Sequence, residues 1–232
     1  MSKQDTDSGL EFLESAEGLA GELGKVEKAL EKNRNTLLII AGAVVAALAG
    51  WFGYQWYVGG QDEQAQSALF APVFAFESDS TNKALKGSAG NPGLIAIADE
   101  YSGTAAANLA HFYTGSALMK QGKYDEAIEH LKAFGASDLL VQARAYALLG
   151  DAYSEKGSYE EAIGYYEKAA SYKPNKDFTP GYLMKLAIAQ EKAKKNKEAL
   201  ETYNKVIETY PQAPDAVNAK KFKGALESAI GE

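Results

Sequence analysis

The sequence predicts an all-α protein in which one N-terminal transmembrane helix is followed by a superhelix of helix-turn-helix units. Two observations support this fold class. The stretch Leu37–Val58 contains 22 residues and no charged side chain. Further along, a pattern of small and aromatic residues recurs, with Ala127, Ala162 and Ala199 separated by 35 and then 37 residues. Recurrence at such a period is typical of stacked repeats.

Composition limits the classes of function. The chain has 24 Lys plus Arg against 31 Asp plus Glu, a net charge of -7. An acidic balance argues against nucleic-acid binding, because phosphate contacts need Lys and Arg. The chain contains no Cys, which excludes disulfides, thiol nucleophiles and Cys-ligated metals. The roughly 170 residues after the apolar stretch are enough for one domain with a hydrophobic core.

The apolar stretch is long enough to cross a bilayer. A helix that rises about 1.5 Å per residue crosses a hydrocarbon core of about 30 Å in about 20 residues. A cleaved signal peptide is the alternative, and Ala47-Leu48-Ala49 resembles a cleavage site. However, 36 mostly polar residues precede the stretch, and cleavage there would expose the aromatic residues that begin at Trp51. Aromatic residues are favoured at the membrane interface, so we expect Leu37–Val58 to span the membrane.

Flanking basic residues predict the orientation of this span. Lys25, Lys28, Lys32 and Arg34 precede it, whereas the first Lys after it is Lys83. Basic residues remain on the cytoplasmic side. We therefore expect a single-pass protein of the bacterial inner membrane, with a cytoplasmic N-terminus and a periplasmic C-terminal domain.

Two stripes suggest contacts near the membrane. In the tail, apolar residues follow a heptad-like spacing that suits a partner helix or the membrane surface, although a marginal helix that docks nowhere has the same pattern. These residues are Phe12, Ala16, Leu19, Leu23, Val26 and Leu30. In the span, small residues recur about once per turn, which would let another helix approach closely, although Gly and Ala are also common in such helices. They are Gly42, Ala46, Gly50 and Gly53.

The segment after the span is expected to contain Asp62–Glu77 and Pro92–Tyr101 as helices, with Ser78–Gly93 as the loop between them. After the repeats, Asp215–Ile230 is expected to form a closing helix.

The second repeat unit shows the physical role expected of each residue in the recurring pattern. We expect Gly150 and Ala162 to be small because two helices cross there, with Tyr153 and Tyr166 filling the space on either side. Gly157 is expected in the turn, where a positive φ costs glycine little. In the third unit, Thr179 is expected to cap the first helix, with Pro180 at its first position.

These spacings resemble the tetratricopeptide repeat over about residues 105–214. The resemblance implies a right-handed superhelix of helix pairs with a concave surface that binds a polypeptide. The family's groove positions carry over to Leu109, Phe112, Ser116, Met119, Arg144, Asp151, Met184 and Ile188. The Lys and Asn with which some relatives hold a terminal carboxylate are absent from these positions, so we expect no capture of that group.

The whole layout resembles the YfgM family of ancillary SecYEG translocon subunits. The matching residues are Gly50-Trp51, Tyr54 and Trp56, followed by Gln64–Leu69. The resemblance implies a periplasmic helper for exported proteins that works with a PpiD-like membrane-anchored chaperone near SecYEG. A membrane-anchored scaffold for envelope assembly or cell division is the alternative. The expected divisions are 1–36 (tail), 37–58 (span), 59–104 (lead-in), 105–214 (repeats) and 215–232 (cap).

No pattern in the sequence indicates catalysis, so we expect no enzyme activity, cofactor or metal. The two histidines, His111 and His130, are expected on a helix face and a solvated face, and two His without Cys make a poor metal site. The acidic pairs Asp125-Glu126 and Glu160-Glu161 are expected at helix starts, where the helix dipole favours carboxylates.

The predicted orientation can be checked by proteolysis. Protease added to spheroplasts is expected to digest the repeats and to leave a protected fragment that contains residues 12–34, because the basic flank keeps the tail inside. Immunoblotting with tags at the two ends measures this. Digestion of the tail with protection of the repeats would show that the orientation is the opposite of the predicted one.

Overall fold

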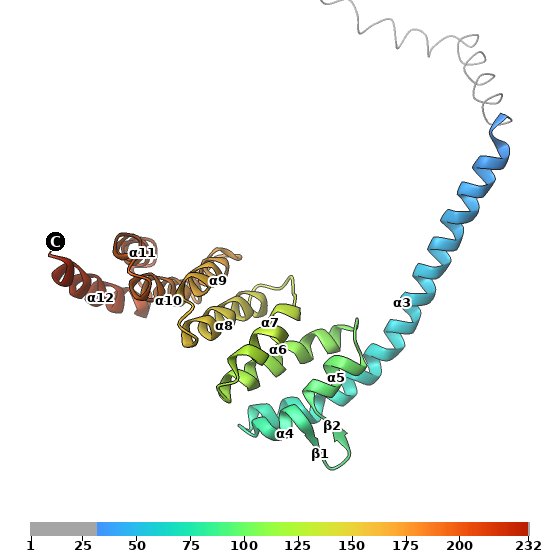
Figure 1. The fold of residues 1–232 in the computed structure, drawn as a ribbon, viewed down its shortest axis with the longest axis horizontal. Coiled ribbons are helices and arrows are strands. Elements are labelled where there is room, and N and C mark those ends of the chain that lie inside the picture. Colours follow the sequence, from blue (N-terminus) through green and yellow to red (C-terminus); the bar gives the residue numbers. More distant parts are fainter. Residues whose placement is uncertain (1–31, 232) are drawn as a thin grey trace, which may run out of the picture. The chain divides into compact units, whose positions relative to one another are not determined.

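The computed structural model describes residues 32–231 (Figure 1). The predicted tail helix with its stripe from Phe12 to Leu30 lies outside these residues. The chain divides into two units, Met1–Tyr57 and Val58–Glu232, and each is described by itself below.

One helix, α3, runs from Arg34 to Glu77. Its apolar part is long and apolar enough to cross a membrane, and none of that part is buried by the rest of the chain. The sequence analysis gave the span Leu37–Val58 and the helix Asp62–Glu77 as separate segments, but one helix continues through Gly59-Gly60. Each glycine costs only about 1 kcal/mol in a helix interior, which a long cooperative helix tolerates.

The segment between α3 and the repeats is more ordered than predicted. Helix α4 (Thr81–Lys86) and a hairpin of β1 (Gly87–Ser88) and β2 (Asn91–Pro92) occupy the stretch expected to be a loop. Ala84 and Leu85 are buried, which holds α4 against its neighbours. Gly87 has a φ of 80°, and a Cβ there would lie 2.2 Å from the Asn91 carbonyl oxygen, so the hairpin requires glycine. Helix α5 (Leu94–Glu100) then forms within the predicted range.

Three helix pairs follow, as the repeat spacing predicts. They are α6 (Ala105–Lys120) with α7 (Tyr124–Ala133), α8 (Val141–Glu155) with α9 (Tyr159–Ser171), and α10 (Thr179–Lys192) with α11 (Asn196–Thr209). The closing helix α12 runs from Pro214 to Ile230. Successive helices of the array lie side by side along the second unit (Figure 1).

Small residues set the distance between paired helices. A Cβ on Gly115 would lie 2.5 Å from Cγ of Leu131, and one on Gly150 would lie 2.5 Å from the Tyr166 ring. In the third pair, the fully buried Ala187 takes the corresponding place. The predicted crossing of two helices at Gly150 is therefore confirmed.

The turns also follow the sequence, with one exception. Gly122 and Gly157 have φ values of 71° and 75° in the first two units, and Lys194 takes a φ of 64° in the third. Thr179 does not cap α10 as expected, because Phe178 occupies the cap position. The Thr179 hydroxyl instead accepts a hydrogen bond of 2.8 Å from the Asn175 backbone N–H, so it holds the preceding turn. Pro180 lies in the first turn of α10, at its second position instead of the predicted first, because the helix begins one residue earlier, at Thr179.

Helix α3 is attached to the array through α6. Ala65 and Leu69 of α3 are buried in one core cluster with Leu94 and Ala110. The Asp62 carboxylate accepts a hydrogen bond of 2.8 Å from the Ala106 backbone N–H, in the first turn of α6. Because the first backbone N–H groups of a helix have no partner within it, Asp62 caps α6 from another helix.

The packing of the helix pairs can be tested by replacing two different glycines by Ala. Gly150→Ala should destabilise the domain by about 1–3 kcal/mol, because the new methyl group meets the Tyr166 ring. Gly164→Ala in α9 should stabilise it by about 0.5–1 kcal/mol, since no atom lies within 4 Å of that site and Ala favours a helix. Thermal unfolding followed by circular dichroism measures both. Equal shifts of the same sign would contradict this packing.

Candidate protein-binding surface

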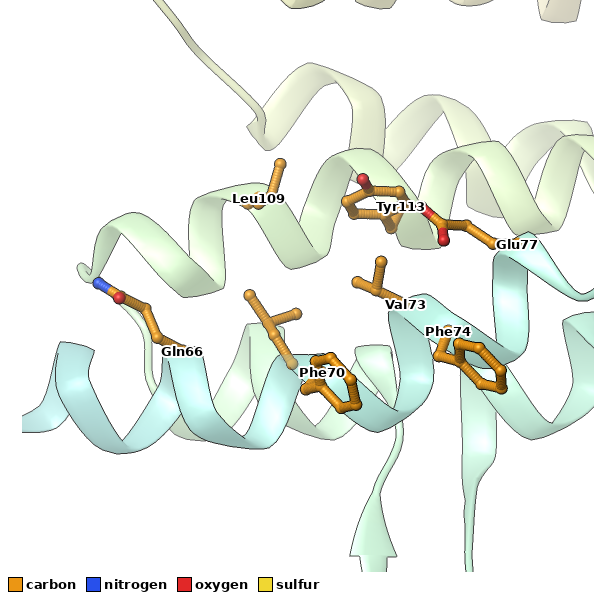
Figure 2. Close-up of a pocket in the computed structure, with 8 residues that line it drawn as sticks. Gln66, Phe70, Val73, Phe74, Glu77, Leu109 and Tyr113 are labelled. Atoms are coloured by element: carbon orange, nitrogen blue, oxygen red, sulfur yellow. The ribbon is translucent and has the colours of Figure 1, made fainter.

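The first helices of the units, together with α3, line three hollows. The first is a cavity of about 430 Å³ between α3 and α6. Figure 2 shows Leu109 and Tyr113 of α6 opposite Val73 of α3, with Phe70 and Phe74 on α3. Gln66, Leu69 and Glu77 complete the lining. Apart from Gln66 and Glu77, which lie at opposite ends of the α3 segment, the side chains are apolar or aromatic. We call this cavity the stem hollow.

The walls of the stem hollow combine fixed and exposed aromatic rings. Tyr113 is held edge-on against Phe76, with ring centroids 5.5 Å apart, and against Phe112 at 5.7 Å. By contrast, Phe70 is 79% exposed and Phe74 is 64% exposed. The two residues are four positions apart and therefore share one face of α3. Exposed aromatic rings beside an apolar hollow are typical of protein-binding surfaces.

The other two hollows adjoin one another between α8 and α10. One, of about 240 Å³, also reaches Phe112 of α6, and the other is of about 310 Å³. Both are lined by Arg144, Phe178 and Tyr182, so we call them together the central groove. The first is also lined by Leu139, Leu140, Val141, Ala143 and Asn175, and the second by Ala147, Leu148, Asp151, Asp177, Gly181 and Lys185.

Asp151 fixes the helices around the central groove. Its carboxylate accepts a hydrogen bond of 2.7 Å from the Tyr166 hydroxyl of α9. It also accepts bonds of 2.6 and 2.8 Å from Nζ of Lys185 on α10. Burial and the neighbouring Asp151 raise the pKa of Tyr166 well above its usual value, so the phenol remains a hydrogen-bond donor. Asp151 therefore joins three helices by itself.

Tyr182 lines the same groove as Arg144 and Asp151, and both charges act on it. Burial raises the pKa of its phenol, the positive charge of Arg144 opposes this rise, and Asp151 adds to it. The phenol therefore stays neutral at physiological pH.

The predicted groove residues are divided between surface and core. Leu109 lines the stem hollow, while Arg144 and Asp151 line the central groove. Phe112 forms part of the wall of the central groove but is only 8% exposed, and Met184 is 6% exposed in the core around α10 and α11. Met184 therefore belongs to the core rather than to an open groove, and most of the Phe112 side chain is covered. The role of the whole set in binding a partner stays a prediction. The apolar residues of a first helix lie both on the face that lines the groove and on the face that packs against neighbouring helices. The sequence does not separate these two faces.

The remaining predicted groove residues lie outside the hollows. Ser116 donates a hydrogen bond of 2.8 Å to the Phe112 carbonyl oxygen of its own helix. Met119 is partly buried against two core clusters. Ile188 is exposed on α10 but lines none of the three hollows.

Sequence reasoning missed Phe70, Phe74, Phe178 and Tyr182. The first two were assigned to a lead-in helix rather than to the surface, although aromatic residues four apart on a helix were a usable signal. Phe178 and Tyr182 lie on either side of the start of α10. The repeat pattern gives no sign that they are surface residues rather than core residues.

The small residues of the apolar stretch are exposed. A Cβ built on Gly42, Gly50 or Gly53 would meet no other atom within 4 Å, and Ala46 is also exposed. Their predicted role in packing against another membrane helix stays a prediction.

The two histidines meet across the first pair. Nδ1 of His111 on α6 lies 2.9 Å from Nδ1 of His130 on α7, so they do not occupy the two separate faces expected. Burial lowers the pKa of both rings, which keeps them neutral and able to share one hydrogen bond. Within residues 32–231, no group of three or more His, Cys, Asp or Glu is arranged to hold a metal ion.

Comparisons with known proteins agree with this architecture. A tetratricopeptide repeat-like domain model matches residues 29–138, and tetratricopeptide repeat models match 114–177 and 182–213. The first match includes α3, α4 and α5, which the sequence analysis placed before the array. The sequence has no match among curated proteins.

Solved structures give the same fold. Crystal structures of kinesin light chain TPR-like repeats from Podosopora anserina, and of a single-substitution variant, both have a TM-score of 0.55. Identity is 15% and 16%, and the match covers 75% of this chain and 87% of each of those chains. At this identity the likeness concerns the fold. The three helix pairs and the three sequence matches together show that the chain contains a domain of tetratricopeptide repeats.

Proposed function

We propose that this chain is a single-pass membrane protein whose repeat domain binds a polypeptide segment of a partner close to the membrane surface. A tetratricopeptide-repeat domain is a scaffold for protein–protein interaction, and such domains are typically non-catalytic. The observation that carries the proposal is the stem hollow, with two strongly exposed phenylalanines beside it.

The chemistry of the stem hollow favours a polypeptide as the bound molecule. Aromatic residues that are exposed in the free protein supply much of the binding energy when a partner buries them. An amphipathic helix that lays its apolar face into such a hollow would cover Phe70 and Phe74 while its polar face remains in water.

The position of Phe70 in the chain limits where the partner lies. Phe70 follows Val58 by 12 residues, and 12 residues of chain reach at most about 40 Å. If Leu37–Val58 crosses the membrane, the segment that binds Phe70 lies within that distance of the membrane surface. A partner that is itself anchored in the membrane, or that emerges from it, satisfies this limit.

The proposed partners are the SecYEG translocon and a PpiD-like membrane-anchored chaperone, with exported proteins as clients. The resemblance of the span and the following Gln64–Leu69 to the YfgM family supports this choice. The proposed location is the periplasmic side of a bacterial inner membrane, supported by the basic residues that precede the span.

Replacing Phe70 and Phe74 together by Ala tests the proposal. Each aromatic anchor can contribute more than 1 kcal/mol, so recovery of the partner should fall at least tenfold, since about 1.4 kcal/mol is one decade. The fold should survive because both rings are largely exposed. The measurement is quantitative mass spectrometry after mild detergent extraction, with thermal unfolding as the check on folding. Val217→Ala, at an exposed site on α12, is the control.

The proteins that are recovered, and the variant that loses them, distinguish the proposal from its alternatives. Recovery of SecYEG and the chaperone with the original chain, and their loss with the double variant, supports the proposal. Recovery of envelope-assembly or division proteins instead would replace the secretion role with the scaffold alternative. A second variant with Leu at Gly42, Ala46 and Gly50 attacks the span. If that variant alone loses the partner, the contact lies in the membrane and the stem hollow does not carry it.

A further inference from the structure

Arg144 is a cation without an acidic partner in the central groove. It lines both parts of the groove, and its side chain is exposed. Among the ion pairs formed by the described residues, none includes Arg144. This is notable in a chain whose net charge is -7.

The acidic residues near Arg144 are committed elsewhere or lie too far away for an ion pair. Asp151 is engaged by Tyr166 and by Lys185. Asp138, which precedes α8, accepts hydrogen bonds of 2.7 and 2.6 Å from the backbone N–H groups of Leu140 and Val141. Asp177 lines the groove but makes no ion pair with Arg144 within 4.0 Å.

Bulky apolar side chains surround this charge. Leu139, Leu140 and Phe178 line the groove, and each is close to half exposed. A guanidinium group presents paired N–H donors that match the two oxygens of a carboxylate. Its attraction to a carboxylate strengthens when apolar groups exclude water from the contact.

We propose that the central groove recognises a polypeptide segment in which an Asp or Glu side chain lies between bulky apolar residues. The acidic side chain pairs with Arg144, and the apolar residues contact Leu139, Leu140 and Phe178. This inference rests on the proposed function as a polypeptide-binding domain, and it names the chemical class of the segment that binds. The acid comes from within the segment and is not a terminal carboxylate.

Peptide display tests the inference. A library of random 12-residue peptides, fused through their C-termini so that no terminal carboxylate is free, is selected on the full chain in detergent micelles. Peptides enriched on the original chain should carry an Asp or Glu flanked by bulky apolar residues. Selection on the Arg144→Glu variant should lose this preference. Lys205→Glu, which makes the same type of charge reversal at an exposed site on α11, should retain it.

Synthetic copies of one enriched peptide, amidated at the C-terminus, then measure the ion pair by fluorescence anisotropy. Changing the peptide's acid to its amide should raise the Kd at least tenfold with the original chain, and by less than threefold with Arg144→Glu. A peptide with Lys in place of the acid should bind Arg144→Glu more tightly than it binds the original chain. A free-acid copy should bind no more tightly than the amidated one.

The possible failures are distinguishable. Peptides that are enriched without an acid, or whose affinity does not change when the acid becomes an amide, overturn this inference but leave polypeptide binding intact. The same holds if Lys205→Glu weakens binding as much as Arg144→Glu, because the effect is then one of general charge. A tighter free-acid copy would assign Arg144 to a terminal carboxylate. If no peptide is enriched, the proposed function fails and this inference fails with it. Unchanged thermal unfolding of both variants shows that the fold is retained.

Discussion

The close approach of paired helices at small residues is the constraint on which the repeat domain depends. Gly115 and Gly150 leave room for Leu131 and Tyr166, and Ala187 takes the equivalent place in the third pair. A side chain as small as a methyl group at either glycine would displace its neighbour. This spacing sets the first helices of the units in a row. The central groove lies between two of them, and the stem hollow lies between the first of them and α3.

Helix α3 extends this row towards the start of the domain. Asp62 caps α6, and the burial of Ala65 and Leu69 fixes the α3 segment against the same core. Since these contacts use one face of α3, another face with Phe70 and Phe74 is left exposed. The helix that contains the apolar stretch thus also contributes to the candidate surface. If that stretch spans a membrane, the proposed partner lies near it.

The surface divides into two chemically different parts. The stem hollow is almost wholly apolar, whereas the central groove contains charges. Within the groove, Asp151 neutralises Lys185 and holds α8, α9 and α10 together, so its role is structural. Among residues 32–231, no ion pair includes Arg144, and this is the charge that the proposed acidic segment would use.

The sequence alone determined the repeat units, the positive φ at Gly157, the length of the apolar stretch and the acidic first turns of α7 and α9. These depend on local spacing and on the backbone preferences of single residues. Only the tertiary structure decided that Phe112 and Met184 are buried, that Phe70 and Phe74 are exposed, and that His111 meets His130. Helical periodicity shows which face of a helix is apolar. Which neighbour covers that face depends on contacts between residues far apart in the sequence, and periodicity carries no information about them.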